Sequence, residues 1–147
     1  MNKGHIASEL RRFLKDVERL YGITKEEIAH HGVYYSHETS THSSPTSSCS
    51  FNEISALREV FGDELLKKLM ITSTKGFTGH AMGCSFEDAA AIVGLQRQVV
   101  PPVKNHKVKD DTLGDLRLSG GGRFSHRFAL RLGAGFGSQV AWAIYLK

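Results

Sequence analysis

The chain has 147 residues, of which 40% are hydrophobic and 23% charged, a composition typical of one folded globular domain and unlike that of disordered or fibrous proteins. No apolar run approaches the ~20 residues that span a bilayer, and the N-terminus leads into a charged amphipathic segment unlike a secretory signal, so we expect a cytoplasmic protein. Two cysteines are too few for a disulfide scaffold, and a net charge of +4 is too diffuse to indicate a nucleic-acid partner.

The first predicted element is an amphipathic helix that ends at Gly22, because glycine favours the left-handed conformation in which many helices stop. Its apolar side chains recur at spacings of three and four residues and form one stripe: Leu10, Phe13, Leu14, Val17, Leu20 and Tyr21. Thr24 and Glu27 have the spacing of a capping box, which predicts a short second helix through about His30.

A strand is predicted over residues 32–36, where β-branched and aromatic residues cluster. The segment that follows, residues 39–50, contains nine Ser or Thr among its twelve residues. Hydroxyl side chains compete with regular backbone pairing, so we predict a loop here. Irregular segments of this length inside a compact domain are more often functional than idle.

Ser50 and Glu53 have the spacing of a second capping box, which predicts a helix that ends at Gly62. A short apolar strand over residues 69–73 comes next, and a glycine-punctuated loop over residues 74–83 follows that strand.

Residues 87–96 predict a helix with almost no polar face, and such a helix is normally buried on all sides. The chain closes with two apolar strands, residues 128–132 and 140–146, joined by a glycine-rich turn. The order of helices and strands indicates an α/β fold with a mixed sheet covered on both faces. A domain of this size has few elements left to bury the apolar helix, which points to a partner domain or a second half of the same fold.

The side chains with useful chemistry follow the predicted strands. His37 comes directly after the strand at 32–36, and Lys75 and His80 follow the strand at 69–73. Active sites of α/β folds gather at strand ends, so two imidazoles and an ammonium there predict an electropositive pocket that stabilises a carboxylate or an enolate oxyanion. The chain has eight histidines, but their spacing matches no known metal site, so we predict no metal.

Four motifs carry a family resemblance. Residues 73–83 read Ser-Thr-Lys-Gly-Phe-Thr-Gly-His-Ala-Met-Gly, and residues 37–41 read His-Glu-Thr-Ser-Thr. Residues 100–105 read Val-Pro-Pro-Val-Lys-Asn, and residues 133–138 read Gly-Ala-Gly-Phe-Gly-Ser. Together these resemble the motifs of the β-ketoacyl synthases, the condensing enzymes of fatty-acid and polyketide synthesis. They occur in family order at near-family spacing over roughly residue 6 to the C-terminus, which makes the combined signal specific.

The resemblance implies a thiolase-like α/β fold, in which two similar halves pack their sheets around buried central helices, with residues 1–147 forming the C-terminal half. It also implies a decarboxylative Claisen condensation between a malonyl-type extender on acyl carrier protein and an acyl group loaded onto a cysteine. Family members carry that cysteine in the N-terminal half, so we expect the isolated chain to be inactive and to need that half as a partner. Surfaces left uncovered predict a homodimer or other self-association.

The resemblance also implies roles for single residues. His37 and His80 would donate hydrogen bonds to the thioester oxygen of the extender as it becomes an enolate. Lys75 would orient the site and hold His80 in place. Phe136 would be the gating residue, with its backbone N–H in the acyl oxyanion hole, and Glu53 would be structural.

No cofactor is implied apart from the phosphopantetheine arm of the carrier protein, which Thr39 and Thr41 would bind by hydrogen bonds.

Several residues depart from the family pattern. Glu38 replaces a glycine of the first histidine motif. Cys49 precedes a helix and superficially resembles an activated nucleophile, but its position corresponds to a loop, and Cys84 corresponds to a small packing residue.

Two further departures lie later in the chain, where Ala134 takes the place of a phenylalanine and Ala89 that of a glutamate, with Glu87 and Asp88 nearby.

The leading interpretation of the sequence is that the chain is part of a 3-oxoacyl-[acyl-carrier-protein] synthase. The alternative is a non-catalytic thiolase-like half that binds carrier protein or another subunit.

Overall fold

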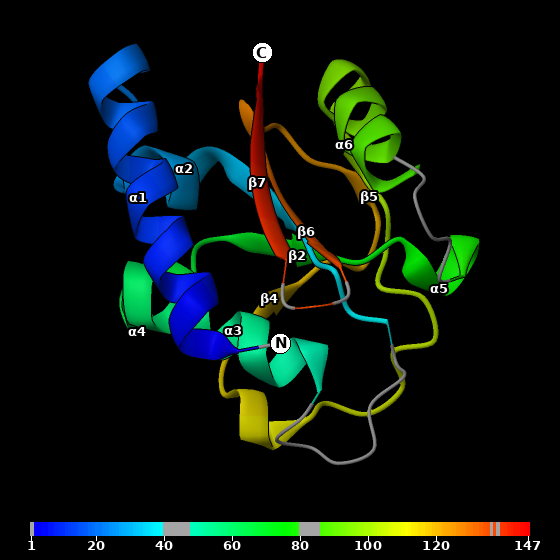
Figure 1. Ribbon diagram of the computed structural model, residues 1–147. Coiled ribbons are helices and arrows are strands. Elements are labelled where there is room, and N and C mark those ends of the chain that lie inside the picture. Colours follow the sequence, from blue (N-terminus) through cyan, green and yellow to red (C-terminus); the bar gives the residue numbers. More distant parts are fainter. Residues whose placement is uncertain (1, 40–47, 80–85, 136, 138) are drawn as a thin grey trace.

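The computed structural model describes residues 2–39, 48–79, 86–135, 137 and 139–147 (Figure 1). The helices in the described residues are α1 (Lys3–Tyr21), α2 (Lys25–His31), α3 (Cys49–Phe61), α4 (Asp63–Leu66), α5 (Lys75–Thr78), α6 (Phe86–Arg97) and the 3₁₀ helix η2 (Asp111–Leu113). The strands are β1 (Gly32–Tyr35), β2 (Met70–Thr72), β3 (Val99–Val100), β4 (Arg117–Leu118), β5 (Gly122–Arg123), β6 (Phe128–Gly135) and β7 (Gln139–Leu146).

Five of these strands form a mixed sheet with the order β4-β2-β1-β6-β7. The four strands from β4 to β6 are parallel, and only β7 runs antiparallel, paired with β6 along its whole length. Tyr35 at the end of β1 is level with Thr72 of β2 and with Arg131 of β6. The carboxyl ends of β1 and β2 therefore lie at the same edge of the sheet, while β6 extends further past it.

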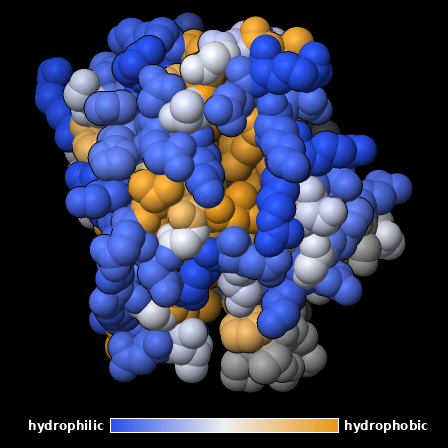
Figure 2. Space-filling view, turned by 90° about the vertical axis from the view of Figure 1, so that its left-hand side faces the viewer, coloured by the Kyte–Doolittle hydropathy of each residue, from blue (hydrophilic) through white to orange (hydrophobic). Residues whose placement is uncertain are grey.

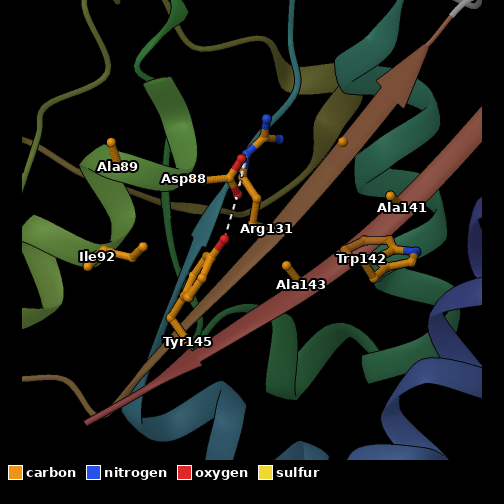
Figure 3. Close-up of a pocket in the computed structure, with 9 residues that line it drawn as sticks. Asp88, Ala89, Ile92, Arg131, Ala141, Trp142, Ala143 and Tyr145 are labelled. Atoms are coloured by element: carbon orange, nitrogen blue, oxygen red, sulfur yellow. Dashed lines mark hydrogen bonds and ion pairs between the residues drawn. The ribbon is translucent and has the colours of Figure 1, made fainter. Parts of the chain in front are cut away.

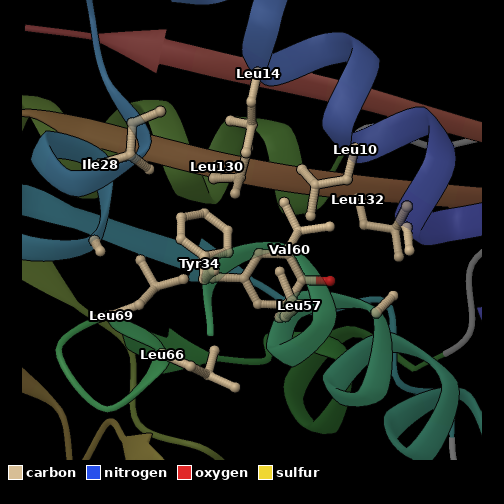
Figure 4. Packing of buried hydrophobic residues seen from close by; sticks show 14 of the residues in the cluster. Leu10, Leu14, Ile28, Tyr34, Leu57, Val60, Leu66, Leu69, Leu130 and Leu132 are labelled. Atoms are coloured by element: carbon tan, nitrogen blue, oxygen red, sulfur yellow. The ribbon is translucent and has the colours of Figure 1, made fainter. Parts of the chain in front are cut away.

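Helices cover both faces of this sheet, as the sequence predicts. Helices α1 to α4 lie on one face and α6 on the other (Figure 1). The larger core lies on the first face, where Leu10 and Leu14 of α1 and Leu57 of α3 pack around Tyr34 and Leu130 of the sheet (Figure 4). On its outer side this helical layer presents mostly hydrophilic side chains (Figure 2). The elements agree with the predicted mixed α/β class.

Helix α1 begins at the cap residue Asn2 and ends where predicted, at Gly22, which has a φ of 68° and donates its N–H to the carbonyl of Glu18 at 2.8 Å. The predicted apolar stripe is wrong at its last two positions, because Leu20 and Tyr21 are exposed. The last turn of α1 projects beyond the other helices on its face, which agrees with this exposure (Figure 1).

Of the two predicted capping boxes, the structure contains the first and not the second. The first is confirmed: the Glu27 N–H donates to Thr24 Oγ1 at 3.2 Å, and the Thr24 N–H donates to Glu27 Oε2 at 2.9 Å. The second is wrong, because Ser48 caps α3 by accepting a hydrogen bond from the backbone of Phe51 at 2.9 Å. Glu53, the expected partner in that box, points into the protein instead.

Helix α6 differs from the expectation that it is buried on all sides. Its inner face packs closely on the sheet. A Cβ on Gly94 would lie 2.8 Å from the backbone oxygen of Val99 and 2.6 Å from the hydroxyl oxygen of Tyr35, so a larger residue would force this packing apart. On the outer face Phe86 is 52% exposed, Ile92 39% and Val93 46%. Within the described residues, then, α6 covers the sheet with one face and leaves an apolar face open.

Two short strands lie between residues 117 and 123, a part of the chain for which the sequence predicted no strand. Strand β4 extends the main sheet by pairing with β2, and β5 pairs with β3 in a separate two-stranded sheet. Two-residue strands have no sequence periodicity, which is why the sequence did not indicate them. Within the described ranges, no helix is both long and apolar enough to cross a membrane.

The two ends of α1 provide a test of this packing. Leu10 is fully buried, so Leu10→Ala should lower the free energy of unfolding by about 2–5 kcal/mol through lost burial and a residual cavity. Leu20→Ala in the same helix should change it by less than about 0.5 kcal/mol, because Leu20 is exposed. Urea unfolding followed by circular dichroism measures both, and equal losses would contradict the described placement of α1.

Candidate active site

The site begins at the carboxyl ends of β1 and β2. The chain leaves β1 through Ser36, whose N–H donates to the Thr72 carbonyl of β2 at 2.9 Å and so continues the pairing of the two strands. His37 follows directly, and Lys75 begins α5 three residues after β2 ends. Parallel pairing therefore brings these two predicted site residues to one edge of the sheet, as their positions after the strands suggested.

A buried carboxylate supports the His37 side of this edge. Glu53 of α3 is 1% exposed, and its Oε2 accepts hydrogen bonds from Tyr34 Oη and Ser36 Oγ, both at 2.8 Å. The backbone N–H of His37 donates to both Glu53 oxygens, at 3.0 and 3.1 Å. Glu53 thus ties the backbone on which His37 sits to helix α3. Burial raises the pKa of Glu53 to about 7, against the opposing effect of the hydrogen bonds from Ser36, Tyr34 and His37.

The start and end of the serine-rich segment meet near this carboxylate. Glu38 Oε2 accepts a hydrogen bond from the backbone N–H of Ser50 in the first turn of α3. Thr39 Oγ1 lies 3.5 Å from Sγ of Cys49, the first residue of α3 and a partly buried free cysteine. Both contacts bring the chain after β1 against the N-terminus of α3.

A second buried carboxylate supports the Lys75 side. Lys75 opens the four-residue helix α5, in a segment expected to be a loop, and its Nζ lies 2.8 Å from Glu87 Oε1 of α6. Burial acts to raise the pKa of Glu87, but the hydrogen bond and charge of Lys75, with the charge of Arg131, hold it below its usual value. The resemblance assigned the family's glutamate position to Ala89; the structure instead brings Glu87 against Lys75.

Arg131 is the buried residue that the sequence reasoning missed. It lies in β6, and its Nη2 is 3.3 Å from Glu87 Oε2. Asp88 Oδ1 lies 3.6 Å from Arg131 Nε and accepts a hydrogen bond from Tyr145 Oη at 3.0 Å. Arg131, Asp88 and Tyr145 line a cavity of about 530 Å³ between α6 and β7 (Figure 3). An arginine in the middle of an otherwise apolar strand was the signal available in the sequence.

Several predicted residues lie outside the described part of the chain: His80, Thr41, Phe136 and Cys84. The placement of these side chains relative to His37 and Lys75 stays a prediction. Among the residues that the structure describes, no group of three or more His, Cys, Asp or Glu side chains is arranged to hold a metal ion.

A parallel sheet with one antiparallel edge strand, helices on both faces and polar residues at adjacent strand ends agrees with the thiolase-like fold that the sequence motifs implied. The chain belongs to the family of the β-ketoacyl synthase C-terminal domain, whose family model matches residues 11–107. This membership confirms the resemblance that the sequence motifs carry.

Curated relatives agree with the family. The chain is 30% identical over 95 residues to the 3-oxoacyl-[acyl-carrier-protein] synthase 2 of Vibrio cholerae, covering 63% of this chain and 21% of the relative. It is 28% identical over 109 residues to the enzyme of the same name from Vibrio harveyi, covering 72% of this chain and 26% of the relative. The chain thus spans about a quarter of the length of these relatives.

Solved structures agree with the fold. A type II polyketide synthase ketosynthase, in complex with its acyl carrier protein and bound to the hexaketide, superposes with a TM-score of 0.75 at 24% identity, over 95% of this chain and 32% of that chain. A β-ketoacyl synthase from Burkholderia phymatum superposes with a TM-score of 0.76 at 18% identity, over 99% of this chain and 33% of that chain. At these identities the likeness concerns the fold alone.

The raised pKa of Glu53 predicts a pH dependence of stability. Because the folded-state pKa of about 7 exceeds the usual 4.5, the protonated form is favoured by folding. The stability that protonated Glu53 contributes is fully present below pH 4.5 and is lost as the pH rises through about 7. Urea unfolding at a series of pH values measures this slope.

Glu53→Gln should flatten that slope, because glutamine does not titrate. The matched control is Glu59→Gln, which removes a half-exposed glutamate from the same helix and should retain the wild-type slope. A Glu53→Gln protein with an unchanged slope would show that another group titrates in this window.

Proposed function

We propose that this chain is the C-terminal part of a 3-oxoacyl-[acyl-carrier-protein] synthase and supplies the decarboxylating side of its condensation site. The observation that carries the proposal is the meeting of His37 and Lys75 at one edge of the sheet, each backed by its own buried carboxylate. Membership of the β-ketoacyl synthase family gives this arrangement its chemical interpretation.

In the proposed reaction, the bond between the extender's carboxylate carbon and its α-carbon breaks and releases carbon dioxide. The electron pair of that bond passes to the thioester, whose oxygen becomes an enolate oxyanion. His37 and His80 donate N–H hydrogen bonds to this oxygen, and such donors are most effective in a water-poor site. The α-carbon then attacks the acyl thioester on a cysteine, and that cysteine leaves as the thiolate.

Each supporting carboxylate has a separate task in this proposal. Glu53 fixes the backbone of His37, so the imidazole starts from an immobilised position at the end of β1. Glu87 pairs with Lys75, so the site keeps a buried ammonium whose charge is partly balanced. A buried charge that lacks a partner is costly, and this pairing allows a lysine to remain there.

The partner that brings the extender is an acyl carrier protein, in keeping with the names of the curated relatives and with the complex among the solved structures. Its phosphopantetheine arm is bound by Thr39 and Thr41, and Phe136 gates the acyl side. Thr39 lies at the point where the chain after β1 meets α3, next to the strand-end residues. The reaction takes place in the cytoplasm.

The open apolar face of α6 is covered in the working enzyme by the N-terminal half of the condensing fold, which supplies the loaded cysteine. Phe86, Ile92 and Val93 would be buried by that contact. The support is that α6 has almost no polar face in its sequence, yet the described residues bury only one side of it.

Reconstitution tests the proposed reaction. The chain is combined with the cysteine-bearing half of the fold and a malonyl-loaded carrier protein, and released carbon dioxide is measured. His37→Ala and His80→Ala should each lower the rate about 100-fold or more, because each removes one oxyanion donor. His5→Ala, which removes an exposed histidine at the start of α1, should leave the rate unchanged.

Unchanged rates in both site variants would contradict the assigned roles. Binding of carrier protein with no release of carbon dioxide by the wild type would instead favour a non-catalytic binding module.

The open face of α6 predicts that the isolated chain self-associates. Sedimentation should show species larger than a monomer, and the double substitution Ile92→Glu, Val93→Glu should reduce them, because charges on this face oppose apolar contact. Lys15→Glu, at an exposed position of α1 on the other face of the sheet, is the control and should not reduce association. A monomeric wild-type chain would contradict the prediction.

A further inference from the structure

Arg131 is a buried cation that the proposed reaction does not use. Its residue is 6% exposed, and among the described residues its Nε and Nη1 have no hydrogen-bond partner. Arginine is rarely buried without a reason, because its charge must be removed from water. Here two carboxylates, Glu87 and Asp88, lie close enough to balance its charge.

Those groups form one chain of charges across three elements. Glu87 of α6 lies between two cations, with Oε1 at 2.8 Å from Lys75 Nζ and Oε2 at 3.3 Å from Arg131 Nη2. Asp88, the next residue of α6, also lies close to Arg131, with Oδ1 3.6 Å from Nε, and Tyr145 of β7 donates to that same oxygen. The two cations are balanced by two carboxylates, so no net charge is buried.

The two oxygens of the Glu87 carboxylate are shared between the two cations, and this sharing sets the position of Lys75. A carboxylate offers two oxygens, and here each cation has one of them. With Arg131 in place, Lys75 can use only one N–H on Glu87, and its ammonium stays at a defined point beside the strand end. Without Arg131, the second oxygen would be free to draw the ammonium into a closer, two-oxygen contact.

The place of Arg131 in the sheet makes this restraint rigid. Arg131 is level with Tyr35 of β1 on one side and with Ala143 of β7 on the other, so its backbone is held by strands on both sides. Asp88 Oδ1 lies near Nε of Arg131 and Glu87 Oε2 near Nη2, and Tyr145 of β7 holds the Asp88 carboxylate with its hydroxyl (Figure 3). With its backbone held between two strands and its guanidinium in contact with Glu87 and Asp88, Arg131 restrains the position of Glu87.

We propose that Arg131 is a positioning residue that acts through Glu87 to hold Lys75 in place at the strand-end site. The inference rests on the proposed function for the role of Lys75. The effect of Arg131 on Glu87, however, can be measured on the chain alone, without an assay of the condensation reaction.

The first experiment follows the carboxyl carbon of Glu87 by NMR during a pH titration of the full chain. Arg131→Met keeps a long apolar side chain but removes the charge, so the pKa of Glu87 should shift upward. Arg131→Lys restores the charge and should return the pKa toward the wild-type value. Arg127→Met, a matched change at an exposed arginine near the start of the same strand, should have no effect.

The charged groups described around Glu87 are Lys75, Arg131 and Asp88, so a second variant can test the coupling from the other side. Asp88→Asn leaves Arg131 in place but removes its other carboxylate, and it should shift the pKa of Glu87 downward. This variant keeps the proposal testable if Arg131→Met does not fold. An unchanged pKa of Glu87 in a folded Arg131→Met protein, or an upward shift in Asp88→Asn, would overturn the proposed coupling.

The second experiment measures decarboxylation in the reconstituted enzyme. Arg131→Met should lower kcat about 10-fold or more with KM for the carrier-bound extender unchanged, because a misplaced Lys75 affects the reacting group and not carrier docking. Arg131→Lys should recover part of this loss. A folded Arg131→Met enzyme with wild-type kcat would overturn the positioning role while leaving the proposed function intact. An inactive wild type whose Glu87 still responds to Arg131 would instead refute the proposed function alone.

Discussion

The parallel pairing of β1 with β2 is the constraint on which the candidate site depends. It sets Tyr35 level with Thr72, and every polar residue that follows either strand must then emerge at the same edge of the sheet. His37 and Lys75 are 38 positions apart in the sequence and share no local element. Only the register of two short strands brings them together, so a slip of one residue would move both side chains and turn each to the wrong face.

Behind that edge, each half of the site is held by a carboxylate from a different helix, and the two carboxylates are in different electrostatic conditions. Glu53 of α3 is surrounded by neutral donors, so burial dominates and raises its pKa to about 7. Glu87 of α6 lies between two cations, which outweigh burial and lower its pKa. The first can restrain a backbone without adding a fixed full charge, whereas the second is an anion that balances a buried ammonium.

The sequence predicted what depends on local spacing and missed what depends on distant contacts. The end of α1 at Gly22 and the Thr24–Glu27 box follow from neighbouring residues, and both are present. The spacing of Ser50 and Glu53 also matched a capping box. The oxygens of Glu53 instead accept hydrogen bonds from Tyr34 of β1 and from Ser36 and His37 just after it, which no local pattern reveals. The strand-end positions of the site residues could be read from the sequence, whereas the ion pairs that anchor Lys75 could not.

Helix α6 connects these observations, because its two faces serve different contacts. Its inner face brings Gly94 against the sheet and presents Glu87 to Lys75 and Arg131, so a small movement of this helix changes the distances in the charge cluster directly. Its outer face is apolar, and Ile92 on that face also lines the cavity into which Asp88 and Arg131 face. A partner that packs on the outer face of α6 would thus bury the cluster more deeply and strengthen its ion pairs by lowering the local dielectric. Under the proposed function, assembly with a partner half and the placement of Lys75 would therefore be coupled through α6.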